Sequence, residues 1–304
     1  MGLIVVLSGV GFGYESVAGR NDAERFPVPG RLVSVGDHQL HVYCTGSGAP
    51  TVVLEAGLAE SSASWEGIQR GLSGGNRVCS YDRAGYAWSQ DGPSPRTAER
   101  EAGELRTLLA NAGEGGPYVL VGHSYGGNIV RVFAHRWPTL TVGLVLIDVT
   151  DESAVTALQI SRPLLALQFT VDQFLVRVGL LRLWSDALVP AEATTAARAQ
   201  ALVVYGSRSM AAARAEAWAA VDSAAQVRAT AGPGALGNLP VVVIVPGGQP
   251  ADAVEQARRL AALSARGRLV VATTTEHYVQ RFQPDLVLKA VHEVMPAVSG
   301  GFGR

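Results

Sequence analysis

The sequence predicts an α/β fold with a mostly parallel central sheet flanked by helices, and two observations support this prediction. Short apolar runs of the kind that form buried strands recur along the chain, and helical patterns separate them. The 304 residues are 48% hydrophobic, enough for one large core. We therefore expect one main domain.

The predicted elements follow one another in alternating order. A hairpin pattern opens the series at residues 31–43, where apolar and polar residues alternate around a Gly-Asp turn. Buried strands are predicted at 51–57, 77–82, 118–124, 143–148, 240–245 and 268–273. Helices are predicted near 62–72, 97–111, 126–136, 252–264 and 285–295.

The alternation stops once, between Asp148 and Pro240. About 90 residues there are rich in Ala, Leu, Val and Arg and have helical periodicity. We interpret residues 151–237 as a helical insertion, and residues 31–150 and 238–298 as the core that receives it. The apolar clusters of the insertion are typical of packing surfaces, and they would also suit the roof of an apolar site.

Residues 1–30 form an apolar N-terminal arm. The run from Gly2 to Tyr14 has about 13 residues, fewer than the roughly 20 that a membrane-spanning helix needs. It resembles the apolar part of a signal peptide but has no basic stretch before it and no clear cleavage site after it. A truncated signal or anchor and a loosely packed arm are both consistent with this pattern. Localisation therefore stays open between the cytoplasm and an exported or membrane-associated state.

Composition narrows the class of partner. The formal net charge is −1 and no long block of like charge occurs, so nothing favours nucleic acid, and membrane association would depend on the N-terminal arm. Two cysteines are too few for a zinc cluster or a disulfide scaffold, so no structural metal is expected. A small-molecule substrate with an apolar part fits best.

The pattern G-x-S-x-G occurs twice, at Ser73 and at Ser124. Ser73 follows a helical stretch and precedes a strand, whereas a nucleophilic serine needs a strand that turns sharply into a helix. Ser124 has that context, because the strand pattern YVLVGH precedes it and an amphipathic helix pattern follows it. We predict that Ser124 is a nucleophile and that Ser73 is not.

With this motif the chain resembles the α/β-hydrolase superfamily, in particular its serine esterase and lipase branch, over residues 31–298. The resemblance implies an α/β-hydrolase fold with a helical cap inserted after strand 6, and an activity that needs no cofactor. It also implies an oxyanion hole formed by the backbone N–H groups of Tyr125 and Leu58. The family commonly has His-Gly before the second donor, where this chain has Ala56-Gly57.

His277 is the predicted general base. It follows the last predicted strand in a loop that resembles the family's histidine loop, which lies above the nucleophile. The other histidines occupy the hairpin, helices or the position beside the nucleophile, and we interpret them as surface or packed side chains; they are His38, His41, His123, His135 and His292.

The third catalytic residue must be a carboxylate that orients the imidazole and stabilises its positive charge. Asp148 ends a predicted strand at a position that some family members use, and we prefer it. Asp252 comes late after the strand at 240–245 and would also suit a helix cap. Asp151 and Glu276 are the remaining alternatives.

These assignments predict a serine hydrolase that cleaves a carboxylic ester through an acyl-enzyme intermediate. A carbon–carbon bond hydrolase, a lactonase or an amidase would use the same residues, and a non-catalytic ligand-binding homologue is the rival from another class. If the family's strand order holds, Cys44 and Cys79 lie on neighbouring strands, as a disulfide or as two buried thiols. We interpret Asp82-Arg83 as a buried ion pair or a turn brace.

Overall fold

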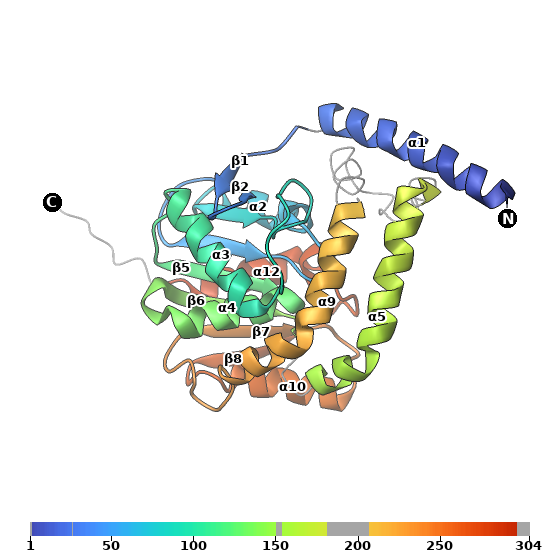
Figure 1. Ribbon diagram of the computed structural model, residues 1–304. Helices are drawn as coiled ribbons and strands as arrows, with labels where there is room; N and C mark the ends of the chain where they lie inside the picture. Colours follow the sequence, from blue (N-terminus) through green and yellow to red (C-terminus); the bar gives the residue numbers. More distant parts are fainter. Residues whose placement is uncertain (1, 26, 150–153, 181–206, 297–304) are drawn as a thin grey trace.

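A computed structural model describes residues 2–25, 27–149, 154–180 and 207–296 (Figure 1). An eight-stranded sheet lies at its centre, in the order β1-β2-β4-β3-β5-β6-β7-β8, and pairing from β4 to β8 is parallel. The strands are β1 (Arg31–Ser34), β2 (Gln39–Thr45), β3 (Thr51–Glu55), β4 (Val78–Tyr81), β5 (Tyr118–His123), β6 (Thr141–Ile147), β7 (Val241–Val245) and β8 (Gly267–Val271). The predicted hairpin forms as the antiparallel pair β1 and β2.

Helices cover both faces of the sheet, as the alternating pattern predicts. One face packs against α3 (Ala98–Asn111), α4 (Tyr125–Arg136) and α10 (Ala251–Ala261), and the other against α2 (Glu66–Leu72) and α12 (Pro284–Val294). The central strands β3, β5 and β7 are buried along their whole length, which explains why they are continuous apolar runs rather than alternating ones. The short elements η1 (Ser62–Trp65), η2 (Pro138–Leu140) and α11 (Val279–Phe282) complete the described core. The predicted fold class is confirmed.

Cys44 and Cys79 form a disulfide between β2 and β4, where they are directly paired across the two antiparallel strands. Of the two alternatives that the sequence left open, the structure has the bonded one. In the described part of the chain, a single cluster of possible metal-ligand side chains occurs, formed by these two cysteines and Glu114. Because both sulfur atoms are committed to the disulfide, the cluster does not offer the thiolates that a soft metal needs.

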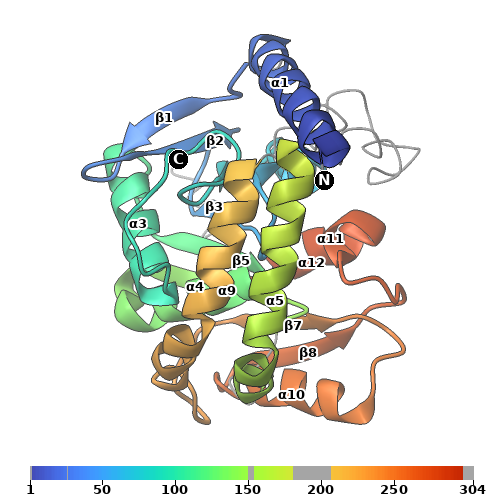
Figure 2. The same ribbon diagram turned by 45° about the vertical axis from the view of Figure 1, so that its right-hand side comes forward.

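The predicted helical insertion follows β6 and precedes β7. Its two described helices, α5 (Ala154–Arg177) and α9 (Ser207–Arg228), lie side by side and extend along one side of the core (Figures 1 and 2). An apolar cluster fills the space beneath them; it comprises Tyr86, Phe169, Val176, Met210, Ala212, Ala213 and Ala217, with Leu58 and Ala59 packed against it. The candidate Asp151 lies outside the described residues.

The N-terminal arm forms one helix, α1 (Gly2–Arg25), whose apolar side chains Val10, Phe12 and Val17 are exposed. It crosses the end of α5 (Figure 2) at a point where a Cβ on Gly11 would come within 2.3 Å of the carbonyl oxygen of Val178. The missing side chain thus allows the two backbones to approach closely. Among the described helices, none combines the length and the apolar character that crossing a membrane requires.

Candidate active site

Ser124 occupies a strained turn between β5 and α4. Its φ of 50° and ψ of −124° lie in a backbone region that residues other than glycine rarely adopt. The neighbouring glycines permit the turn, because a Cβ on Gly122 would lie 2.7 Å from the Cα of Gly127 and one on Gly126 would lie 2.4 Å from the carbonyl oxygen of Ala56. Ser73, in contrast, ends α2 with ordinary helical angles. The two G-x-S-x-G matches therefore differ in conformation as well as in context.

His277 and Asp148 meet at the same end of the sheet, although 129 residues separate them in sequence. Asp148 follows β6 directly, and its Oδ2 atom lies 2.5 Å from Nδ1 of His277. The hydrogen bond to Asp148 raises the pKa of His277 and outweighs burial, which lowers it; the charge of Glu60 also raises it. With its Nδ1 proton donated to Asp148, the neutral imidazole keeps a lone pair on Nε2 that can accept a proton.

The histidine ring lies beside the serine turn. The ring centroids of His277 and of His123, the residue before Ser124, are 4.5 Å apart. No hydrogen bond joins the Ser124 hydroxyl to His277 in the described part of the chain. Such bonds are often long before a substrate binds and shorten in the reacting complex.

The other candidate acids are placed differently. Asp252 is exposed in the first turn of α10, where its charge suits the helix N-terminus, although Pro250 holds the cap position itself. Glu276 is exposed in the loop before His277. Of the described candidates, Asp148 is the carboxylate that contacts the imidazole.

The resemblance assigns the oxyanion hole to the backbone N–H groups of Tyr125 and Leu58. Tyr125 begins α4, so its N–H has no partner within the helix, and Leu58 lies in the turn that follows β3. Neither group donates a hydrogen bond to another residue that the structure describes. The turn around Leu58 is closed by a hydrogen bond from Glu60 N–H to the carbonyl oxygen of Gly57, with Ala59 at a φ of 59°.

A buried histidine that the sequence did not single out joins this turn to the base. His123 is fully buried; its Nε2 donates to the carbonyl oxygen of His277 at 3.0 Å, and its Nδ1 lies 2.7 Å from Oε1 of Glu60. Burial raises the pKa of Glu60, but the interactions with His123, together with smaller ones from Ser64 and Arg281, outweigh it and lower that pKa below its usual value. Of the surface and packed alternatives, His123 is packed, and it also contacts the backbone of the loop that carries His277.

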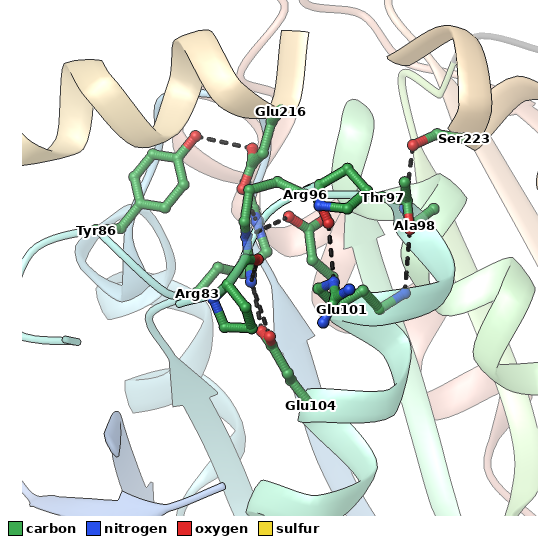
Figure 3. A network of polar contacts seen from close by, with 12 residues as sticks. Arg83, Tyr86, Arg96, Thr97, Ala98, Glu101, Glu104, Glu216 and Ser223 are labelled. Carbon is green, nitrogen blue, oxygen red and sulfur yellow. Dashed lines mark hydrogen bonds and ion pairs between the residues drawn. The ribbon is translucent and has the colours of Figure 1, made fainter. Parts of the chain in front are cut away.

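Asp82 and Arg83, interpreted from the sequence as a buried ion pair or a turn brace, each form a buried ion pair with a different partner, and Arg83 also braces a turn. Asp82 contacts Nδ1 of His41 at 2.7 Å and accepts the N–H of Ser62, so it braces the hairpin against the core. Arg83 instead binds two glutamates and the backbone of the turn before Leu58. Figure 3 shows Arg83 with one of them, Glu216, in a buried polar network. Consecutive residues at a strand end point to opposite sides, which explains the separate partners.

Residues 50–284 match the sequence model of the alpha/beta hydrolase fold family. The chain belongs to this family. Curated relatives match only in part: a probable transporter, efuK, from Hormonema carpetanum is 34% identical over 140 residues, 43% of this chain and 20% of the relative. The protein YqjL of Bacillus subtilis is 36% identical over 103 residues, 34% of this chain and 41% of YqjL. The chain thus spans less than half the length of these relatives.

Solved structures of α/β hydrolases share the fold at low identity. An esterase from Thermogutta terrifontis aligns with a TM-score of 0.66 and 21% identity, covering 86% of this chain and 96% of the esterase. An enol-lactonase from Burkholderia xenovorans aligns at 0.64 with 20% identity, covering 87% and 99%. The Cif epoxide hydrolase from Acinetobacter nosocomialis aligns at 0.76 with 16% identity, covering 95% and 97%. These likenesses establish the α/β-hydrolase fold and leave the substrate open.

Proposed function

We propose that this α/β hydrolase is a serine hydrolase that cleaves carboxylic esters through an acyl-enzyme intermediate. The observation that carries the proposal is the contact of 2.5 Å between His277 and Asp148 beside the strained Ser124 turn. A nucleophilic serine, a histidine and a carboxylate that holds its Nδ1 are the groups that acyl transfer to water requires.

In the proposed reaction, His277 Nε2 removes the hydroxyl proton of Ser124 while the serine oxygen attacks the ester carbonyl carbon. The carbonyl oxygen becomes an oxyanion, and the N–H groups of Leu58 and Tyr125 donate hydrogen bonds to it. His277 then gives the proton to the departing alcohol. Water, deprotonated by the same histidine, attacks the acyl enzyme and releases the acid. Asp148 keeps the imidazole in the productive tautomer and stabilises its positive charge.

The surroundings of the turn favour a substrate with an apolar part. Leu58 and Ala59 pack against the apolar cluster beneath α5 and α9, which includes Phe169 and Met210. We propose that α5 and α9 belong to a cap over the site, since they place this cluster next to the proposed oxyanion hole. An acyl or alcohol chain bound against it would gain about 0.8 kcal/mol for each buried methylene.

Hydrolysis of p-nitrophenyl esters of increasing chain length tests the proposal. The variants are Ser124→Ala and, as a matched control, Ser73→Ala, which removes the serine of the other G-x-S-x-G match. We expect turnover that is lost in Ser124→Ala and retained in Ser73→Ala, with a preference among chain lengths. If no ester is hydrolysed, or if Ser124→Ala remains as active as the wild type, ester hydrolysis at Ser124 is wrong.

The proposed nucleophile is a serine, so the proposed reaction differs from those in which an aspartate attacks the substrate. Lactones, amides and activated carbon–carbon bonds would react through the same groups, so the ester series should be followed by a γ-lactone and an anilide. Turnover of one of these in place of esters would keep the mechanism and change the substrate class. A ligand-binding protein without catalysis would turn over none of them.

A further inference from the structure

The guanidinium of Arg83 is fully occupied by buried acceptors. Its side chain is 2% exposed, and those of Glu55 and Glu216 are inaccessible to solvent. Nε and Nη2 donate to the two carboxylate oxygens of Glu216 at 2.8 and 2.9 Å, while Nη1 donates to Glu55 at 2.8 Å. The remaining donors bind the carbonyl oxygens of Ala56 and Gly57 at 2.6 and 2.8 Å. All five N–H donors of an arginine are thereby used.

One of these acceptors belongs to the peptide unit that carries a proposed oxyanion donor. The carbonyl of Gly57 and the N–H of Leu58 lie in one planar trans peptide, so fixing the direction of the oxygen fixes the opposite direction of the N–H. The next peptide is held as well, because the N–H of Ala59 donates to the hydroxyl of Tyr86 at 3.3 Å. That hydroxyl in turn donates to Glu216 at 2.8 Å.

Both supports of the Leu58 peptide thus lead to a single carboxylate on the inserted helix α9. Figure 3 shows Glu216 projecting from this helix toward Arg83 and Tyr86, which come from the core. Arg83 and Glu216 are 133 residues apart in sequence. The carboxylate therefore joins the insertion to the turn that contains Leu58.

We propose that Glu216 is a positioning residue: it aims the Leu58 N–H into the oxyanion hole, so that docking of α9 completes the catalytic site. The proposal rests on the proposed function, because it assigns Leu58 its role there. Glu216 accepts hydrogen bonds from Arg83 and Tyr86, and no hydrogen bond described for it reaches Ser124 or His277.

The energetics of the network favour a positioning role over simple stabilisation. Burying several charges carries a desolvation cost that often equals or exceeds their mutual attraction. Glu101, also buried, adds a third acid near Arg83, and burial together with the charge of Glu216 raises the pKa of Glu101 well above its usual value. Apolar side chains of similar size would often stabilise such a region equally well. The charged network differs from apolar packing in that it fixes the geometry of the hydrogen bonds.

The test compares two variants of the network with one control on the same helix. Glu216→Gln keeps the size of the side chain but removes the charge and one acceptor, and Tyr86→Phe removes only the hydroxyl that links Glu216 to Ala59. The control is Arg208→Ala, which breaks an exposed ion pair between α9 and Asp91 that does not touch the turn.

Steady-state kinetics on the preferred p-nitrophenyl ester give the first readout. Removing an oxyanion-hole donor typically lowers kcat by about 10²–10³-fold. A donor that is present but points in the wrong direction should lower kcat by less than its complete removal would. We expect Glu216→Gln to lower kcat by roughly 10–100-fold with KM within about twofold, Tyr86→Phe to lower it by roughly 3–10-fold, and Arg208→Ala to leave it unchanged.

Inhibition by an alkyl trifluoromethyl ketone gives a readout that a purely structural role would not move. The serine adds to this ketone and generates an oxyanion, so its inhibition constant should rise in parallel with the loss of kcat/KM across the variants. Thermal melting of each variant identifies losses that come from unfolding. If Glu216→Gln does not fold, Tyr86→Phe decides the question by the same two measurements.

Wild-type kcat and unchanged ketone inhibition in folded Glu216→Gln or Tyr86→Phe would overturn the inference and leave the proposed function intact. A rise in KM with unchanged kcat would also overturn it, since Glu216 would then act on substrate binding. Absence of Ser124-dependent turnover in the wild type is a different result, because it would remove the proposed function itself and the inference with it.

Discussion

The buried carboxyl group of Glu55 predicts a loss of stability as pH rises through neutrality. Glu55 is inaccessible to solvent, and burial raises its pKa from 4.5 to about 7, against the opposing effects of Arg83 and Tyr81. A raised pKa means that the folded protein binds this proton more tightly than the unfolded chain. The stability that the proton provides is fully present below pH 4.5 and is lost as pH rises through 7.

The size of the effect follows from the shift. A difference of one pKa unit corresponds to about 1.36 kcal/mol, so a rise from 4.5 to about 7 makes the free energy of unfolding about 3 kcal/mol lower above roughly pH 8 than below pH 4.5. Most of this loss falls between about pH 5 and pH 8. Glu55→Gln removes the titrating group and keeps the shape of a protonated glutamate. We expect the variant to match the wild type near pH 5 and to lose less stability than the wild type above pH 7.

Urea denaturation at pH 5, 6, 7 and 8 gives the free energy of unfolding of the wild type and of Glu55→Gln. The slope of this free energy against pH is then compared between the two proteins. Other groups with raised pKa values, such as His277 and Glu101, titrate in both proteins, so the comparison isolates Glu55. Glu255→Gln, which changes an exposed carboxylate paired with Arg258, is the control and should keep the wild-type slope. Equal slopes in wild type and Glu55→Gln would refute the assignment of a raised pKa to this residue.

Three further predictions concern the acid, the serine turn and the disulfide. Asp148→Asn should lower kcat/KM for ester hydrolysis by roughly 10³–10⁴-fold, because an amide favours the wrong histidine tautomer, whereas Asp252→Asn should have little effect; equal losses would contradict the assignment. Gly126→Ala should lower the free energy of unfolding by about 1–3 kcal/mol, since its Cβ would lie 2.4 Å from a backbone oxygen; an unchanged melting temperature would argue against this close approach. Reducing the Cys44–Cys79 bond should cost up to about 4 kcal/mol for residues 35 apart, measured by denaturation with and without reductant; identical curves would show that the bond contributes nothing.

Sequence patterns were sufficient to predict those parts of the candidate site that are recognised from the neighbouring residues in the sequence. Ser124 lies between a strand and a helix, and this local context alone distinguishes it from Ser73. The placement of His277 depended on the family resemblance, and its contact with Asp148 agrees with that expectation. The sequence left Asp148 and Asp252 as alternatives because both acids follow neighbouring strands, and the structure brings Asp148 into contact with His277.

Contacts between distant segments were not predictable in this way. Nothing in the sequence links Arg83 to Glu216, since the helix that carries the glutamate reaches the core only through tertiary packing. The role of His123 did have a signal: it ends a strand predicted to be buried, and a buried imidazole needs polar partners. Its partners, Glu60 and the His277 backbone, could not be named without the fold.

Labelling with a fluorophosphonate probe, followed by mapping of the modified peptide, tests the central claim most directly. The probe reacts with a serine only when a neighbouring base activates it. The proposed mechanism predicts one modified residue, Ser124, with labelling that is abolished in Ser124→Ala and His277→Ala and retained in Ser73→Ala. A folded wild-type protein that remains unlabelled, or one modified at a different serine, would contradict it.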